Sequence, residues 1–184
     1  MIYQRFLPSL LLACVLGTTA AAQQSAAGGD FTLTDHNGEK FRLADQRGKV
    51  ILLFFGYTSC TEACPVILSR VNSVFKQLGP ERGKAMAVFI SVDPERDTPQ
   101  VLREYVNYFS AHTVALTGKK EEIDAVVKQY GAKYEIEKSD SALGYHVSHT
   151  TDIYLIDQRG ALQTRFKHTD RAALMAAGVK RLWQ

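Results

Sequence analysis

Residues 50–65 read VILLFFGYTSCTEACP, a stretch in which a wholly apolar run ends at a glycine and leads into two cysteines and a proline. The run from Val50 to Phe55 is typical of a strand that is buried on both faces. Beyond Pro65, apolar side chains recur at helical spacing as far as Leu78. The stretch therefore predicts a junction between a buried strand and a helix, with two thiols at the junction.

Cys60 and Cys64 are interpreted as a functional pair. Pro65 suits the first position of a helix and disfavours helical backbone in the residue before it, so Cys64 is predicted to be the N-cap. The positive end of a helix stabilises a thiolate, which attacks disulfides or binds a soft metal. The spacing also allows a Cys60–Cys64 disulfide. The pair is then a redox couple, a metal clamp or both. A purely structural disulfide is the alternative, disfavoured because so short a loop restrains little chain entropy.

Residues 1–22 have the composition of a secretory signal peptide, with a basic residue ahead of an apolar run that is too short to span a bilayer. We expect cleavage after Ala22, a polar tether over residues 23–29 and one folded domain over residues 30–184. The alternative is lipidation at Cys14, because LLAC resembles the recognition box of bacterial lipoproteins. The protein is expected to be exported to the periplasm, and lipidation would attach it to the membrane.

The composition is that of an ordinary globular domain: of 184 residues, 46% are hydrophobic and 22% are charged. The formal net charge is +3, and loss of Arg5 with the signal peptide lowers it to +2. This near balance predicts no nucleic-acid partner. In an oxidising compartment the two cysteines left after cleavage are expected to form a disulfide unless they are reduced or bound to a metal.

Strand and helix signals alternate after the cysteine junction, and an N-terminal β-hairpin around Asn37 and Gly38 precedes it. The expected strands are residues 50–55, 86–92, 114–116, 152–157 and 161–166, and the expected helices are residues 65–78, 99–109, 119–130 and a C-terminal helix opened by Thr169. This order predicts an α/β sandwich in which a mixed central sheet is flanked by helices, similar to the thioredoxin fold.

His149 is the expected third member of the site. In the predicted sheet the two apolar strands run parallel and the strand after His149 runs antiparallel to them, so His149 lies at the same edge as Cys60 and Asp93. Two thiolates and one imidazole form a soft, low-coordinate ligand set that suits copper, as Cu(I) or Cu(II). The alternative is a solvated loop histidine, and His146 is a weaker candidate ligand.

Three segments in this order, behind an export signal, resemble the Sco/SenC family of thioredoxin-like copper proteins, which assist the assembly of cytochrome c oxidase. They are GYTSCTEACP at residues 56–65, SVDPERDTP at residues 91–99 and GYHVSHTTDIYLID at residues 144–157. The resemblance extends from Phe31 to the C-terminus. The resemblance implies that copper is bound by Cys60, Cys64 and His149. It also implies that a neighbouring acidic loop is formed by Asp93, Pro94 and Asp97.

The chain departs from the family pattern at three positions. Thr61 and Glu62 stand where the family commonly has proline and aspartate, and Ser148 stands where an aspartate precedes the ligand histidine. Glu62 keeps the negative charge, whereas Ser148 removes a carboxylate that favours a cationic metal. Asp93 and Asp97 are expected either to cap the turn and the helix that follow them, or to support the metal ligands and partner docking.

Two functions fit these residues. The first is an exported copper metallochaperone that takes copper from a donor and delivers it to the copper-site subunit of a respiratory oxidase. The second is a thiol-disulfide reductase that keeps the cysteines of that copper site reduced, with Cys60 as attacking thiolate, Cys64 as resolving thiol and an external thiol reductant. The three-residue spacer and the lack of a proline near His149 in the sequence favour metal binding over catalysis. We expect a monomer that is not an enzyme.

Overall fold

The computed structural model describes residues 27–109, 112–140 and 144–183. The predicted signal peptide, its cleavage after Ala22 and the lipidation at Cys14 lie outside these residues and stay predictions. The first strand, β1 (Thr32–Asp35), begins just after Asp30, where the folded domain is expected to start. None of the described helices has both the length and the apolar character that a bilayer crossing requires.

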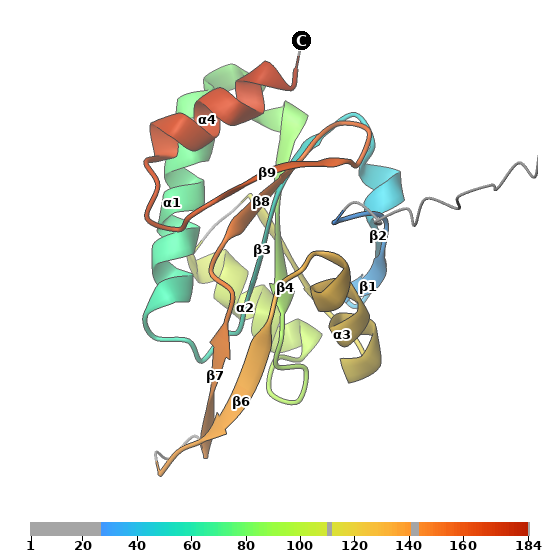
Figure 1. Ribbon diagram of the computed structural model, residues 1–184, viewed down its shortest axis with the longest axis vertical. Coiled ribbons are helices and arrows are strands. Elements are labelled where there is room, and N and C mark those ends of the chain that lie inside the picture. Colours follow the sequence, from blue (N-terminus) through green and yellow to red (C-terminus); the bar gives the residue numbers. More distant parts are fainter. Residues whose placement is uncertain (1–26, 110–111, 141–143, 184) are drawn as a thin grey trace, which may run out of the picture.

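A seven-stranded mixed sheet forms the centre of the molecule (Figure 1). Its strands lie in the order β2 (Lys40–Arg42), β1 (Thr32–Asp35), β5 (Thr113–Thr117), β4 (Ala85–Ser91), β3 (Val50–Gly56), β8 (Ile153–Ile156) and β9 (Leu162–Phe166). As the sequence predicts, β3 and β4 are parallel, β8 is antiparallel to β3, and β1 and β2 form the N-terminal hairpin. The carboxyl ends of β3 and β4 therefore meet at one edge of the sheet, where the cysteines and Asp93 follow.

Helices cover both faces of the sheet, which confirms the α/β sandwich. Three of them pack on one face, α1 (Ala63–Leu78), α2 (Pro99–Phe109) and α4 (Ala172–Arg181), and α3 (Lys120–Gln129) packs on the other. Short 3-10 helices cover Leu43–Gln46 and Gly79–Lys84. Strand β3 contributes alternate side chains to both layers, and none from Val50 to Phe55 is more than 1% exposed. This two-sided burial explains the continuous apolar run.

Two helix starts differ from those predicted. Helix α1 begins at Ala63 with Glu62 as its N-cap, so the prediction that Cys64 is the N-cap was wrong. Pro65 is the third residue of α1, a position that tolerates proline because the first amides of a helix have no partner within it. Helix α4 begins at Ala172 with Arg171 as its N-cap, rather than at Thr169.

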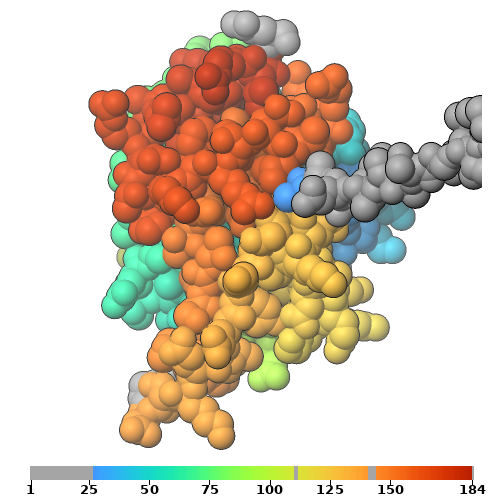
Figure 2. Space-filling model, viewed as in Figure 1, coloured from blue at the N-terminus to red at the C-terminus, as the bar shows by residue number. Residues whose placement is uncertain are grey.

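A second sheet, absent from the sequence-based prediction, carries the predicted histidine. Strands β6 (Tyr134–Lys138) and β7 (Tyr145–His149) form an antiparallel hairpin that pairs with no other strand of the described chain. The hairpin stands out from the body at the end of the molecule where the cysteines lie (Figures 1 and 2). His149 is its last residue, only three residues before β8, so the base of the hairpin reaches the carboxyl edge of the main sheet.

Candidate metal centre

The two cysteines flank the start of α1, after a loop that we call the cysteine loop, residues 57–62. A hydrogen bond from the Cys60 amide to the Tyr57 carbonyl, 3.2 Å long, closes this loop. The Cys64 amide donates to the Cys60 sulfur at 3.4 Å. Both thiols are free, and they differ in access: Cys60 is 8% exposed and Cys64 is 0% exposed.

The electrostatics of the pair favour a thiolate on Cys60. Hydrogen bonding from the Cys64 thiol, with smaller contributions from the Cys64 and Glu62 amides, lowers the pKa of Cys60 to about 3. The same thiol–thiolate hydrogen bond, together with burial, raises the pKa of Cys64 above its usual range. An N-cap position would instead have made Cys64 the easily deprotonated cysteine. The reverse holds because Cys64 lies inside the helix and its amide points at the Cys60 sulfur.

Gly56, at the end of β3, makes room for the buried thiol. A Cβ at this position would lie 2.5 Å from the Cys64 sulfur and 2.8 Å from Phe89 Cε2. Neither neighbour can easily move, because Phe89 lies in the core and Cys64 is fixed in the helix. The glycine that ends the apolar run in the sequence is therefore needed for the sulfur to approach the sheet.

We expect the substitution Gly56→Ala to displace the Cys64 sulfur and to lower the free energy of unfolding by about 1–3 kcal/mol, the usual cost of overpacking. Thermal unfolding, together with metal titration of the variant, measures both effects. Gly83→Ala is the matched control, because a Cβ there meets nothing within 4 Å. Unchanged stability and unchanged metal affinity in Gly56→Ala would show that the crowding at Cys64 is easily relieved.

His149 turns its Nε2 atom toward the thiols, 3.6 Å from the Cys64 sulfur. Its Nδ1 lies 3.0 Å from the Thr150 carbonyl oxygen, which only accepts hydrogen bonds, so Nδ1 carries a proton. This arrangement selects the tautomer whose Nε2 lone pair is available to a metal. A ligand histidine commonly donates its other N–H in this way, because the bond fixes both the tautomer and the ring orientation.

The structure brings the three predicted ligands together. Ligand atoms of Cys60, Cys64 and His149 all lie within 4.8 Å of one another, and no other group of three or more histidine, cysteine or acidic ligands converges in this way among the described residues. His146, the weaker candidate, instead points its Nε2 at Glu137 of the hairpin, 3.0 Å away. A groove of about 450 Å³, lined by the cysteine loop and β7, opens onto Cys60 and His149.

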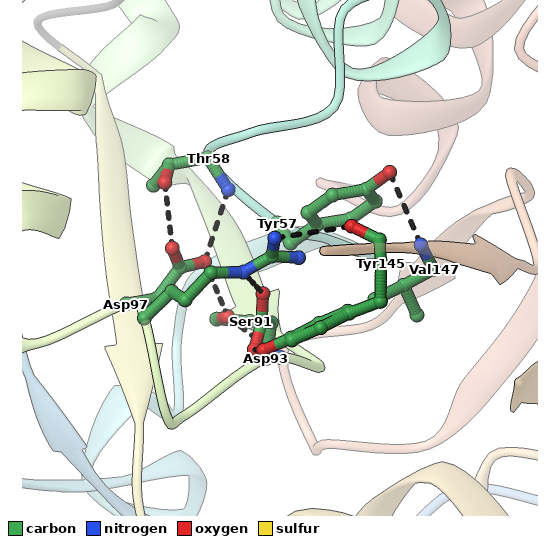
Figure 3. A network of polar contacts seen from close by, with 8 residues as sticks. Tyr57, Thr58, Ser91, Asp93, Asp97, Tyr145 and Val147 are labelled. Atoms are coloured by element: carbon green, nitrogen blue, oxygen red, sulfur yellow. Dashed lines mark hydrogen bonds and ion pairs between the residues drawn. The ribbon is translucent and has the colours of Figure 1, made fainter. Parts of the chain in front are cut away.

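Asp97 holds the cysteine loop rather than capping the next helix. Its buried carboxylate accepts hydrogen bonds from the Thr58 amide at 3.0 Å, the Thr58 hydroxyl at 2.6 Å and the Ser91 hydroxyl at 2.6 Å (Figure 3). Burial raises the pKa of Asp97 above its ordinary value although these bonds oppose the shift. The first turn of α2 is capped by the Thr98 hydroxyl, which accepts a hydrogen bond from the Val101 amide.

Asp93 contacts the hairpin. Its carboxylate, 2% exposed, accepts a 2.8 Å hydrogen bond from the Tyr145 hydroxyl and forms an ion pair with Arg96 (Figure 3). Tyr57, at the start of the cysteine loop, accepts a hydrogen bond from the Val147 amide at 3.3 Å, and its ring meets the His149 ring edge to face at 5.8 Å. Sequence reasoning assigned no role in the site to Thr58, Ser91, Arg96 or the two tyrosines. Apart from the local bonds of Ser91 and the Arg96–Asp93 pair, their contacts join segments at least 39 residues apart in the chain, so no local pattern indicates them.

Comparison with known proteins gives consistent relationships along most of the chain. The SCO1/SenC family model matches residues 19–184. An SCO2-like protein of Rickettsia felis is 36% identical over 140 residues, which make up 76% of this chain and 68% of the relative. The family match covers all three residues of the cluster and both aspartates.

Solved structures match the fold as well. ScoI of Bradyrhizobium japonicum, a structure with copper bound, is 37% identical, with a TM-score of 0.79 over 85% of this chain and 99% of the other. A SCO1/SenC family lipoprotein of Bacillus anthracis is 26% identical, with a TM-score of 0.74 over 88% of this chain and 97% of the other. The likeness to these structures confirms the predicted thioredoxin-like sandwich.

Proposed function

The chain belongs to the SCO1/SenC family, and from that premise we propose that it is a copper chaperone which carries one copper ion between three side chains. The ligands would be the sulfur atoms of Cys60 and Cys64 and the Nε2 atom of His149. The observation that carries the proposal is the convergence of these atoms within 4.8 Å, with the Nε2 lone pair turned toward the thiols.

The donor set fits copper by its chemistry. Thiolates and a neutral imidazole are soft or borderline ligands, and a site with three of them suits Cu(I), while the imidazole also supports Cu(II). The related ScoI of Bradyrhizobium japonicum carries copper in its structure, which supports the same cargo here. Ser148 supplies no carboxylate beside the histidine. However, Ser148 is paired with Glu135 across the hairpin, so a carboxylate lies on the neighbouring strand, opposite Ser148.

A copper ion that is cargo has to enter and leave the site, so the site must be accessible to a partner protein. Cys60 and His149 line an open groove instead of a closed cage, so the ligands of a partner can reach the metal. We propose that the acceptor is the copper-site subunit of a respiratory oxidase, and that a copper donor or a thiol reductant loads or resets the site. Export to the periplasm is part of this proposal, and the lipoprotein relative supports the alternative of membrane attachment through Cys14.

One observation favours a second function, thiol-disulfide reduction. Cys60 has a thiolate and partial access, and Cys64 is a buried thiol beside it, as an attacking and a resolving cysteine require. Cys60 would attack a substrate disulfide, break its S–S bond, form a mixed disulfide with one sulfur and release the other as a thiolate, which can take up the Cys64 proton. Cys64 would then attack the Cys60 sulfur and displace the second substrate sulfur as a thiolate, which leaves a Cys60–Cys64 disulfide for an external dithiol to reduce. His149 has no necessary part in these steps, and this separates the two functions.

Replacing His149 with alanine should therefore abolish Cu(II) binding and oxidase assembly, while the fold and the reduction potential of the cysteine pair stay close to those of the parent protein. His146→Ala is the matched control, because His146 lies on the same strand but points at Glu137. Cu(II) titration, the thiol reduction potential and oxidase activity in a complemented deletion strain provide the three measurements. Normal oxidase assembly with His149→Ala would favour the reductase.

A further inference from the structure

We propose that Asp93, Arg96 and Tyr145 form a latch that positions His149 for copper, through contacts other than the hydrogen bonds by which Asp97 holds the cysteine loop. The inference rests on the proposed copper site and deepens it, because it assigns to Arg96 and Tyr145 a role in that site which the ligand set alone does not reveal. Arg96 and Tyr145 would be positioning residues, since neither belongs to the ligand cluster.

The hairpin needs such a device because no strand pairing joins it to the main sheet among the described residues. Side chains in a strand alternate between its two faces, so Tyr145, Val147 and His149 share one face of β7. Each of the three meets the body of the protein: Tyr145 at Asp93, Val147 in the core with 3% exposure, and His149 at the thiols. The orientation of this one face decides where the imidazole lies.

Arg96 binds the hairpin at its far end by three kinds of contact. Its Nη1 donates to the Tyr145 carbonyl at 3.2 Å, its guanidinium carbon lies 3.7 Å from the centre of the Tyr145 ring, and its Nε is paired with Asp93. A planar guanidinium can make all three contacts at once, whereas a lysine ammonium cannot. The same guanidinium lies 5.7 Å from the centre of the Tyr57 ring, which in turn contacts the His149 ring.

Asp93 ties this latch to the rigid part of the fold. It follows β4 closely, it is 2% exposed, and its amide donates to the Ser91 hydroxyl at 3.1 Å. The Tyr145 hydroxyl is thereby attached to the end of a central strand (Figure 3). The hairpin cannot tilt away from the thiols without breaking the contacts of both Asp93 and Arg96.

The thiols are held by a different residue of the same loop. Asp97 bonds the cysteine loop through Thr58, with no contact to the hairpin among the hydrogen bonds of the described chain. Residues of one loop after β4 therefore contact both parts of the site. Asp97 holds the cysteine loop, and the Asp93–Arg96 pair holds the hairpin that carries His149. Loss of the latch should weaken copper binding only as far as His149 contributes to it.

The sign of the effect separates positioning from a simple charge effect. Arg96 is a cation near a cation site, so removal of its charge would by itself strengthen copper binding. The latch predicts the opposite. Arg96→Gln and Tyr145→Phe should each weaken Cu(I) binding by about 10-fold to 100-fold, the range found for residues that orient metal ligands.

The test is a double-mutant cycle in the reduced protein, with Cu(I) competition titrations of Arg96→Gln and Tyr145→Phe in two backgrounds. In the parent background each variant should lose affinity as stated. In the His149→Ala background neither should lose more, because the only ligand that the latch positions is gone. Arg103→Gln, an exposed arginine of α2, is the matched control and should change nothing.

Equal losses of affinity in both backgrounds would overturn the latch, because Arg96 would then act on the thiols or on the fold. Unchanged or stronger copper binding in the parent background would overturn it as well. A readout without copper keeps this test separate from the copper proposal. In the metal-free protein, Arg96→Gln should speed hydrogen exchange of the Val147 amide by about 10-fold relative to amides of β3, because the hairpin opens locally. An unchanged exchange rate of the Val147 amide would refute the latch even if copper binds as proposed. A faster exchange rate in a protein that binds no copper would refute only the copper site.

Discussion

Replacing either Cys60 or Cys64 with serine should reduce Cu(I) affinity by about a thousand-fold, which corresponds to about 4 kcal/mol. The reduced protein, produced from Gln23 onward, should bind one Cu(I) per chain, because the described residues hold one cluster of three ligands. Each variant removes one of only two thiolates and leaves a hydroxyl, a hard ligand that Cu(I) disfavours. Titration against a Cu(I) chelator of known affinity measures the loss.

The two serine variants should differ in stability although they agree in copper binding. Cys64 is completely buried, and the shorter side chain of serine would leave its hydroxyl farther than the thiol from the Cys60 sulfur and the His149 Nε2 atom, at a cost of about 1–3 kcal/mol for a poorly satisfied buried hydroxyl. Cys60 borders the groove, so water can solvate a serine at that position at a smaller cost. Thr61→Ser, an exposed change in the same loop, is the control. Retention of full copper affinity in either cysteine variant would refute the ligand assignment.

Formation of a Cys60–Cys64 disulfide should abolish copper binding, and reduction should restore it. Copper needs both sulfurs as thiolates, and a disulfide provides neither. Titrations of the oxidised and the reduced protein under the same conditions measure the difference. Equal affinity in the two redox states would mean that the sulfurs are not the ligands.

The reduced pair should also show a simple pH dependence. At neutral pH the low pKa of Cys60 already leaves it as a thiolate, whereas the raised pKa of Cys64 keeps its proton. Copper therefore displaces about one proton per ion, mainly from Cys64, and affinity should rise by about tenfold for each pH unit between roughly pH 6 and pH 8. Lowering the pH has the opposite effect, because protons then compete better for Cys64. A Cu(I) titration series across this range, with proton release followed in weak buffer, provides the test.

The middle of the main sheet could be predicted from the sequence because β3, β4 and β8 are almost wholly apolar. Strand β3 is buried on both faces, so its run of apolar residues has no competing interpretation. The hairpin of β6 and β7 could not be predicted in the same way. Four of the five residues of β6 are exposed, and the two strands pair only with each other, so the pattern lacks the apolar contrast that marks a strand.

The convergence of Cys60, Cys64 and His149 could be predicted from the sequence, but the detailed geometry around them could not. The topology argument correctly put His149 at the edge of the cysteines, because β8 does run antiparallel to β3. The position of Cys64 was predicted wrongly: proline fits more than one position of a first helical turn, and Cys64 lies inside the helix instead of at its N-cap. The roles of Asp93 and Asp97 depend on partners about 40 and 50 residues away along the chain.

The unequal access of the two sulfur atoms would give the proposed copper transfer an order. Cys64 is completely buried, and of the three cluster residues only Cys60 and His149 line the groove. The ligands of an acceptor would therefore replace Cys60 and His149 first, while Cys64 still held the ion, and Cys64 would release it last. Loading from a donor would pass through the same shared states in reverse, so the metal would stay bonded to one protein or the other at each stage.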